Sequence, residues 1–150
     1  MYMIDSVYRS LVHFTQTLVP SGVVVVDGEA YGVRLDDPTG QSPSVSVTLG
    51  DVTESALELG SLGVGLPVVF TIHAKSRIQR DALKSIIFSG LAYRQIGMFS
   101  TFSGFVPQSE AVEYFGQNGY IRISDMPNFE SDREKFFWSS VVYVTLSALI

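Results

Sequence analysis

The chain has 150 residues, of which 46% are hydrophobic and 12% aromatic, so it is the size of one domain and too apolar to be disordered. Its formal net charge of −5 argues against a nucleic-acid-binding protein, which needs a basic surface to neutralise phosphates. The absence of cysteine excludes disulfides, thiolate zinc sites and cysteine nucleophiles. We therefore treat residues 1–150 as a single domain.

The first half of the chain predicts one helix followed by strands. Apolar residues at three- and four-residue steps predict an amphipathic helix over residues 2–18. A β-branched run at 23–26 is followed at 27–28 by Asp-Gly, a dipeptide typical of hairpin turns. Apolar and polar residues then alternate over 31–35 and 45–49. These segments predict a β-meander with one buried face.

The strongest local signal lies in the middle of the chain. Ser76 and Gln79 have the spacing of a capping box, which predicts the start of a helix over 77–89. Gly90 is a plausible C-terminal stop, although the helix could continue to Tyr93. The expected apolar face of this helix consists of Ile78, Ala82, Leu83, Ile86 and Ile87.

Two segments are irregular in their pattern. Residues 50–66 combine helically spaced acids with glycines, and we interpret them as an extended edge or loop segment. Residues 94–119 form a Phe-rich loop that either packs on its own domain or docks onto a partner. The other predicted elements are a strand at 67–74, a short strand at 120–123, a polar link at 126–134 and a closing strand at 136–146. This order predicts an α+β fold, a mostly antiparallel sheet with two helices packed on one face.

The closing strand and the overall composition suggest that other chains cover part of the surface. Apolar residues occur on both faces of the predicted strand at 136–146, so both faces are expected to be buried. Charged residues make up 17% of the chain, whereas ~25% is usual for a soluble domain. No signal peptide is expected, because Asp5 and Arg9 interrupt the N-terminal region. No uncharged span reaches the ~20 residues of a membrane helix, so we expect a soluble protein with no membrane partner.

Residues with catalytic or metal-binding chemistry are few. His13 and His73 lack the spacing of a zinc motif such as H-E-x-x-H, and no G-x-S-x-G elbow is present. The glycines of residues 60–65 form neither a dinucleotide-binding fingerprint nor a P-loop. The acidic pair at 36–37 belongs to an ordinary turn sequence. We therefore expect a protein that is not an enzyme, with no catalytic residue, no cofactor and no metal.

One local positive patch is present, formed by Lys75, Arg77, Arg80 and Lys84. It is either the solvated face of the predicted helix or an intersubunit surface that faces acidic residues of a neighbour. Tryptophan, tyrosine and arginine contribute most to binding at protein interfaces. The candidate interface residues are Arg77, Arg80, Tyr93, Phe99, Phe102, Asp51, Glu54 and Glu58.

The sequence reads E-L-G-S at 58–61 and P-V-V-F-T-I-H-A-K-S-R-I-Q-R-D-A-L at 67–83. This stretch resembles the small neck and tail-completion proteins of tailed bacteriophages, the tail terminators in particular. In them, E-L-G-S precedes a strand and a helix with the pattern (I/V)-x-(I/V)-x-A-x-(S/N)-R-x-Q-R-D-x-L. The N-terminal helix and the aromatic segment at 136–138 in the last strand share the family's layout.

The resemblance implies a structural virion protein that forms a ring, often a hexamer, at the head-proximal end of the phage tail. Its partners would be the tail tube protein and the neck connector proteins, with double-stranded DNA only passing through the lumen. The protein would assemble in the host cytoplasm and reside in the virion. The family has no catalytic residues to carry over. A net acidic subunit suits such a channel, because a negative wall does not hold phosphates.

Three other interpretations stay open. A head–tail connector or stopper protein would use residues 94–119 to plug a channel. A small-ligand or peptide-binding α+β domain would have a largely preformed apolar pocket and would be a monomer or dimer. Its pocket would use Tyr93, Phe99, Phe102 and Tyr114. An enzyme using His73 with Asp81 or Asp51 ranks last, because nothing in the sequence supplies a nucleophile or cofactor.

Overall fold

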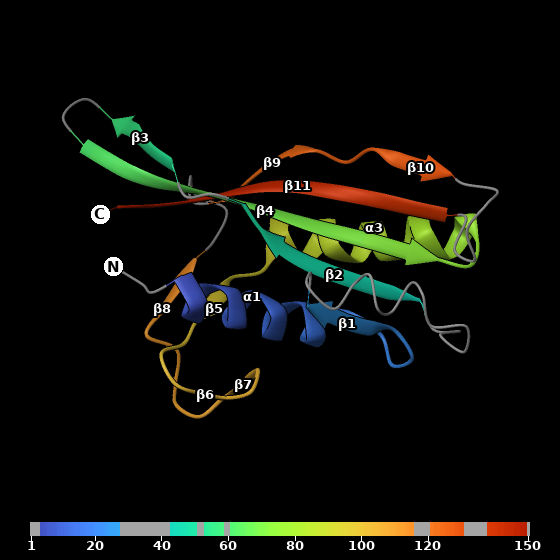
Figure 1. Ribbon diagram of the computed structural model, residues 1–150, viewed down its shortest axis with the longest axis horizontal. Helices are drawn as coiled ribbons and strands as arrows, with labels where there is room; N and C mark the ends of the chain where they lie inside the picture. Colours follow the sequence, from blue (N-terminus) through green and yellow to red (C-terminus); the bar gives the residue numbers. More distant parts are fainter. Residues whose placement is uncertain are drawn as a thin grey trace.

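Two long antiparallel strands, β4 (Ser61–Ala74) and β11 (Trp138–Leu149), form the centre of the sheet in the computed structural model (Figure 1). Their ladder runs from the pair Trp138↔Ala74 to the pair Leu149↔Gly63. Both strands are rich in β-branched residues, which fit a pleated and buried surface. The structure describes residues 4–27, 43–50, 53–58, 61–115, 121–130 and 138–149.

Shorter strands flank this central pair on both sides. β2 (Ser44–Leu49) and β3 (Thr53–Glu58) pair in succession with β4, and both run antiparallel to it. β9 (Ile121–Asp125) and β10 (Asn128–Glu130) do the same along β11. β1 (Val24–Asp27) pairs with β2 and is parallel to it. The seven strands of this sheet that the structure describes therefore fill five strand positions.

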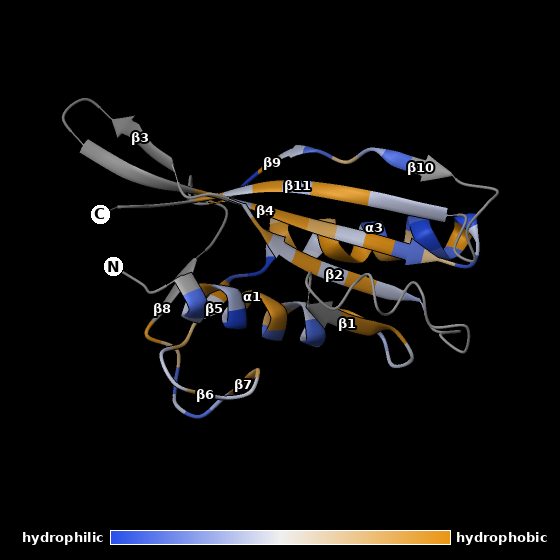
Figure 2. Cartoon of the chain, in the orientation of Figure 1, coloured by the Kyte–Doolittle hydropathy of each residue, from blue (hydrophilic) through white to orange (hydrophobic). Residues whose placement is uncertain are grey.

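Helices α1 (Ile4–Leu18) and α3 (Arg77–Tyr93) contribute to one core with the sheet. Alternate residues of the strands face this core, and their hydrophobic character shows along β2, β4 and β11 in Figure 2. Burying one such side chain contributes about 1.5–3 kcal/mol. The fully buried side chains of the sheet include Val45, Val47, Val68, Phe70, Ile72 and Val142. These observations confirm the predicted α+β fold.

A small lobe, residues 96–115, packs on the other side of α1. It contains two strand pairs, β5 (Ile96–Met98) with β8 (Glu113–Phe115) and β6 (Phe102–Ser103) with β7 (Val106–Pro107). Ile96 is 0% exposed and belongs to the main core. Most of the predicted Phe-rich loop is thus structured and packs on its own domain.

Both predicted helices are present, and the second has the longer of its two expected extents. The predicted helix at 2–18 is α1, with residues 1–3 outside the described part. α3 begins at the predicted Arg77 but continues through Gly90 to Tyr93, so Gly90 is not a stop. A Cβ atom at Gly90 would lie 2.4 Å from Leu18 Cδ1. The glycine therefore permits a close approach of α3 to the end of α1.

The strand predictions need two corrections. The β-meander is wrong, because β1 and β2 are direct neighbours and parallel, whereas a meander places consecutive antiparallel strands side by side. The expected strand at 31–35 lies outside the described residues. Of the two interpretations of residues 50–66, the extended edge segment fits, because they contain β3 and the beginning of β4. The predicted polar link at 126–134 contains β10.

One part of the sheet extends beyond the helices. β3 and residues 61–65 of β4 form an antiparallel hairpin, and the end of β11 pairs with the same stretch of β4. Figure 1 shows this hairpin projecting from one end of the molecule, past the ends of α1 and α3. We call β3 with residues 61–65 the arm.

Candidate interaction surface

Helix α3 begins with the predicted cap. The backbone N–H of Gln79 donates to Ser76 Oγ at 3.1 Å, and Gln79 Oε1 accepts from the backbone N–H of Lys75 at 2.9 Å. These two bonds satisfy amide groups that a helix start otherwise leaves unpaired. The cap therefore fixes where α3 starts.

The outward face of α3 is unusually apolar. Ile78 is 82% exposed, Tyr93 is 81% exposed and Phe88 is 40% exposed. Ala82 is also exposed, so the expected apolar face that included Ile78 and Ala82 is wrong in part. A different stripe faces the core, and it consists of Arg80, Leu83, Ile87, Gly90, Leu91 and Ala92. The exposed hydrophobics are the surface residues that the sequence pattern missed.

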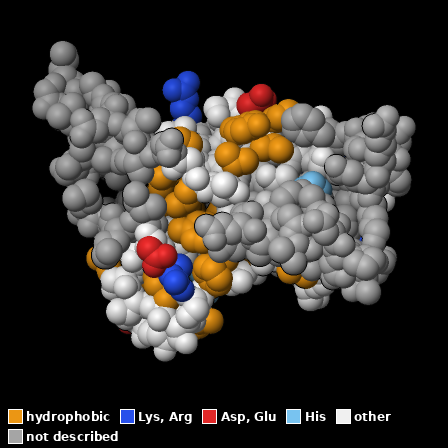
Figure 3. Space-filling view, in the orientation of Figure 1, with side chains coloured by type: hydrophobic (Ala, Val, Ile, Leu, Met, Phe, Trp, Pro, Cys, Tyr) orange, Lys and Arg blue, Asp and Glu red, His pale blue; other side chains and the backbone are white. Residues whose placement is uncertain are grey.

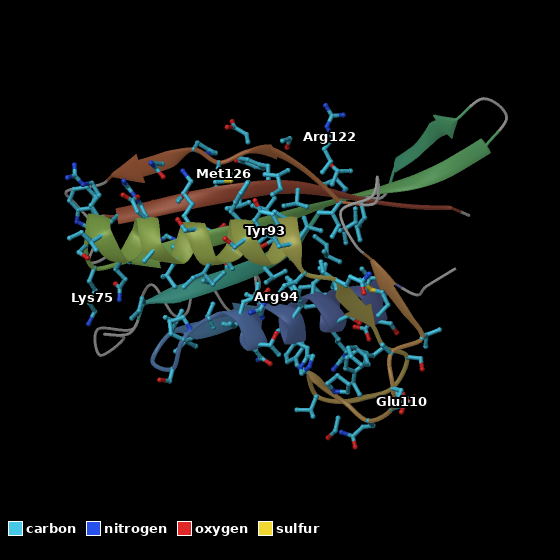
Figure 4. The ribbon with its side chains drawn as sticks, turned by 180° about the vertical axis from the view of Figure 1, so that it is seen from behind. Lys75, Tyr93, Arg94, Glu110, Arg122 and Met126 are labelled. Atoms are coloured by element: carbon cyan, nitrogen blue, oxygen red, sulfur yellow. The ribbon has the colours of Figure 1, made fainter. Side chains whose placement is uncertain are left out.

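Two open grooves run beside α3, and both are lined by Ser85 and Ser89. The first has a volume of about 380 Å³ and separates α3 from the end of α1; Leu18, Tyr93 and Arg94 line it. The second has a volume of about 440 Å³ and lies toward the β9–β10 connection. Its lining comprises Asp81, Lys84, Ser85, Phe88, Ser89 and Met126. Figure 4 shows Tyr93 and Met126 on this side of the molecule.

Some side chains of the predicted basic patch are exposed, and others contact residues of their own chain. Lys75 and Arg77 are exposed at the start of α3, and Arg94 is exposed just after its end. Lys84 is half-buried, and its Nζ donates to Asn128 Oδ1 at 3.0 Å. The first two cations are therefore available for an external partner at one end of the helix.

Arg80 is not part of this exposed patch. It is 4% exposed, its Nε donates to Asp81 Oδ1 at 3.1 Å, and its guanidinium lies 5.4 Å from the ring centroid of Trp138. A guanidinium over an indole face is attracted to the ring's π-electrons. The structure thus places Arg80 in the interface between α3 and β11 of its own chain.

The aromatic candidates of the lobe contact α1 and each other. The rings of Phe99 and Phe102 lie 6.2 Å apart, and the ring of Phe99 lies edge-on to that of His13 at 5.8 Å. Tyr93 instead lines the groove between α3 and Leu18. These three candidates therefore do not line one pocket, and the side chain of Tyr114 is outside the described part.

The acidic candidates lie far from the start of α3. Glu54 and Glu58 belong to β3 and hence to the arm, whereas Asp51 lies outside the described residues. Lys75 lies at the opposite end of the molecule from the arm (Figure 4). Within one chain, the structure therefore separates the β3 positions Glu54 and Glu58 from Lys75.

The face of the sheet opposite the helices also carries apolar side chains. Val69 pairs with Tyr143 and Thr71 with Val141 across β4 and β11. Tyr143 is 40% exposed, and Val69 and Val141 are half-buried. Figure 3 shows hydrophobic side chains gathered on this face over β9 and β11. The closing strand is therefore apolar on both faces, as its sequence predicts.

Burial lowers the pKa of both histidines. His73, on the sheet face opposite the helices, is 5% exposed, and burial lowers its pKa to about 4. Burial against the lobe also lowers the pKa of His13. Among the described residues, no three histidine, aspartate or glutamate side chains lie close enough to hold a metal ion. In the same part of the chain, neither helix has the length and apolar character needed to span a membrane.

No protein-family model matches the chain, and no curated protein matches its sequence.

Proposed function

We propose that this chain is a structural protein of a tailed bacteriophage, a tail terminator or related neck protein, whose copies assemble into a ring. Such a ring would end the tail tube and join it to the neck, leaving a lumen through which DNA passes. In this role the chain is not an enzyme and needs no cofactor.

The observation that carries the proposal is the apolar outer face of α3. Ile78 at its start and Tyr93 at its end are each more than 80% exposed, and Phe88 and Tyr93 line the two grooves beside it. Only 17% of the residues of the chain are charged. Exposed apolar surface of this kind marks sites of protein association. A second apolar area on the opposite side of the sheet, at Val141 and Tyr143, fits a subunit with neighbours on several sides.

The resemblance to phage tail terminators supports a ring as the kind of assembly. The segment 67–83 that carries it comprises the second half of β4, the Ser76 cap and the first part of α3. It therefore includes the beginning of the exposed helix rather than a catalytic cleft. A head–tail connector or stopper ring is the alternative within the same class.

The test is the mass of the purified protein by light scattering over a dilution series, with negative-stain images of each peak. A ring of six copies has a mass of about 100 kDa and shows a central hole. A monomer at every concentration would contradict self-assembly and would favour the small-ligand or peptide-binding domain, which the grooves beside α3 could serve.

A further inference from the structure

Charge is divided between two neighbouring segments of the chain. Residues 35–74 contain five acidic residues and no lysine or arginine, whereas residues 75–94 contain five basic residues and one acidic residue. In the structure, the arm with Glu54 and Glu58 projects at one end of the molecule. Lys75 lies at the other end (Figure 4), and Arg77 follows it as the first residue of α3. Their attraction can therefore be satisfied between copies but not within one copy.

The arm also has an edge that needs covering. β3 pairs with β4, and no other strand that the structure describes pairs with its second edge. Natural proteins protect such edges with charged residues or cover them with another element. Between these two charges the arm sequence contains Ala56 and Leu57, and Leu62 follows in β4. The arm therefore combines apolar and acidic residues on a short projecting hairpin.

The outer face of α3 is complementary to the arm, because it is apolar and carries positive charge. It combines exposed apolar side chains with the exposed cations Lys75 and Arg77. Its 17 residues give a length of about 25 Å, and the six residues of β3 give about 20 Å. The grooves along α3 have the small residues Ser85 and Ser89 between them, which leaves room for close approach.

We infer that the arm of one copy lies along the outer face of α3 of a neighbouring copy, with its acidic residues against Lys75 and Arg77. This inference rests on the proposed ring and names the contact that builds it. The two surfaces differ, so the contact is head-to-tail and can continue from copy to copy. Opposite charges then fix the direction in which the arm lies along the helix.

Engineered cysteines test the contact directly, because the native chain contains none. A tagged Ser61→Cys chain is mixed with an untagged Ser85→Cys chain under mild oxidation, so that the heterodimer has its own mobility on a non-reducing gel. We expect this pair to cross-link at least ten times faster than Ser61→Cys with Ser103→Cys. Ser103 is an equally exposed serine in the lobe, away from α3. Equal rates for the two pairs would overturn the inferred contact.

Charge reversal provides the second measurement, again with matched controls. Glu58→Lys and Arg77→Glu should each weaken self-association about ten-fold, because an attraction becomes a repulsion. Glu110→Lys and Arg122→Glu reverse exposed charges elsewhere and should leave association unchanged. A 1:1 mixture of Glu58→Lys and Arg77→Glu chains should regain assembly, since each arm then meets an oppositely charged helix. Arg77→Glu should not unfold the protein, because a carboxylate is favourable at a helix start.

The outcomes separate this inference from the proposed function. Rings that form normally in both variants, without the selective cross-link, would overturn the arm contact and keep the ring. The selective cross-link with only open chains or dimers would support the contact and contradict the ring. A wild-type chain that remains monomeric and does not cross-link would overturn both.

Discussion

Helices α1 and α3 lie on the same face of the sheet, yet the chain covers them very differently. The lobe closes over α1: the Phe99 backbone N–H donates to Ser10 Oγ at 3.1 Å, and the Arg9 guanidinium lies 5.5 Å from the ring centroid of Phe105. Within the described residues, nothing comparable covers the outer face of α3, where Ile78 is 82% exposed. One helix is covered by its own chain, and the other keeps an exposed apolar face.

The difference shows that the amphipathic pattern of a helix does not reveal whether another segment of the chain covers its outer face. Both helices bury a core stripe, and in both the stripe includes a residue with polar atoms, Ser10 in α1 and Arg80 in α3. What distinguishes them is a segment distant in sequence, residues 96–115, that packs against only one of them. Four measurements test this contrast between α1 and α3.

The largest effect is expected in the core of α1. Leu11 is 0% exposed, and Leu11→Ala should lower the free energy of unfolding by about 3 kcal/mol, because it leaves a cavity. Ile78→Ala on the outer face of α3 should change it by less than about 0.5 kcal/mol. Urea titrations followed by circular dichroism measure both. Similar losses in the two variants would mean that the outer face of α3 is covered within the monomer.

Acidic pH should lower the free energy of unfolding through His73, which lies on the sheet face opposite the helices. Burial lowers the pKa of His73 from the ordinary 6.5 to about 4, so between these values the unfolded chain binds the proton and the folded chain does not. Stability is therefore complete above pH 6.5 and falls as the pH is lowered toward 4, by about 2 kcal/mol. Urea titrations at pH 7 and pH 4.5 should show this loss. His73→Gln, which cannot take up the proton, should show a smaller loss between these pH values.

A smaller effect is expected where the two helices meet. Gly90→Ala places a methyl group against Leu18 and should destabilise the protein by about 1 kcal/mol, although alanine favours an open helix by a similar amount. Ser89→Ala, one position earlier on the exposed side, should not destabilise. In a Leu18→Ala background, Gly90→Ala should become neutral or stabilising. Thermal unfolding followed by circular dichroism measures all three, and a stabilising Gly90→Ala in the native background would contradict the close crossing.

The smallest effect on stability is expected for the outer face of α3. Ile78→Ser with Tyr93→Ser should change the free energy of unfolding by less than about 0.5 kcal/mol, because both side chains are largely in solvent. The same variant should bind less of a hydrophobic fluorescent dye and should self-associate more weakly. His13→Gln, with a side chain between α1 and the lobe, serves as a control that should not alter dye binding. Unchanged dye binding in the serine variant would show that another segment already covers this face.

Local signals in the sequence predicted the local features well. Ser76 and Gln79 gave the start of α3, and apolar periodicity gave α1. The closing strand was recognised because its residues are apolar on both faces. Each of these features depends on residues close together in the chain.

The features that the sequence did not predict depend on distant contacts. Arg80 looked like a surface cation, but Trp138, far along the chain, provides the ring that it lies against. Gly90 looked like a helix end, and its role follows from Leu18 in the other helix. Glu54 and Glu58 are spaced as on one face of a helix, so the sequence pattern did not indicate the strand β3. Its extended conformation depends on pairing with β4. No pattern among neighbouring residues in the sequence indicates the parallel pairing of β1 with β2.

The central pairing of β4 with β11 has a consequence for how the protein folds. Between these strands in the chain lie α3 and the whole lobe, so the longest ladder of the sheet joins segments that are synthesised far apart in time. Pairing of distant segments slows folding, because the connecting chain must be ordered before the contacts form. Until β11 arrives, β4 has only its hairpin neighbours β2 and β3, and one edge of a very apolar strand is open. Exposed strand edges of this kind can pair with other chains, so the interval before β11 is made is one in which the newly made chain is open to aggregation.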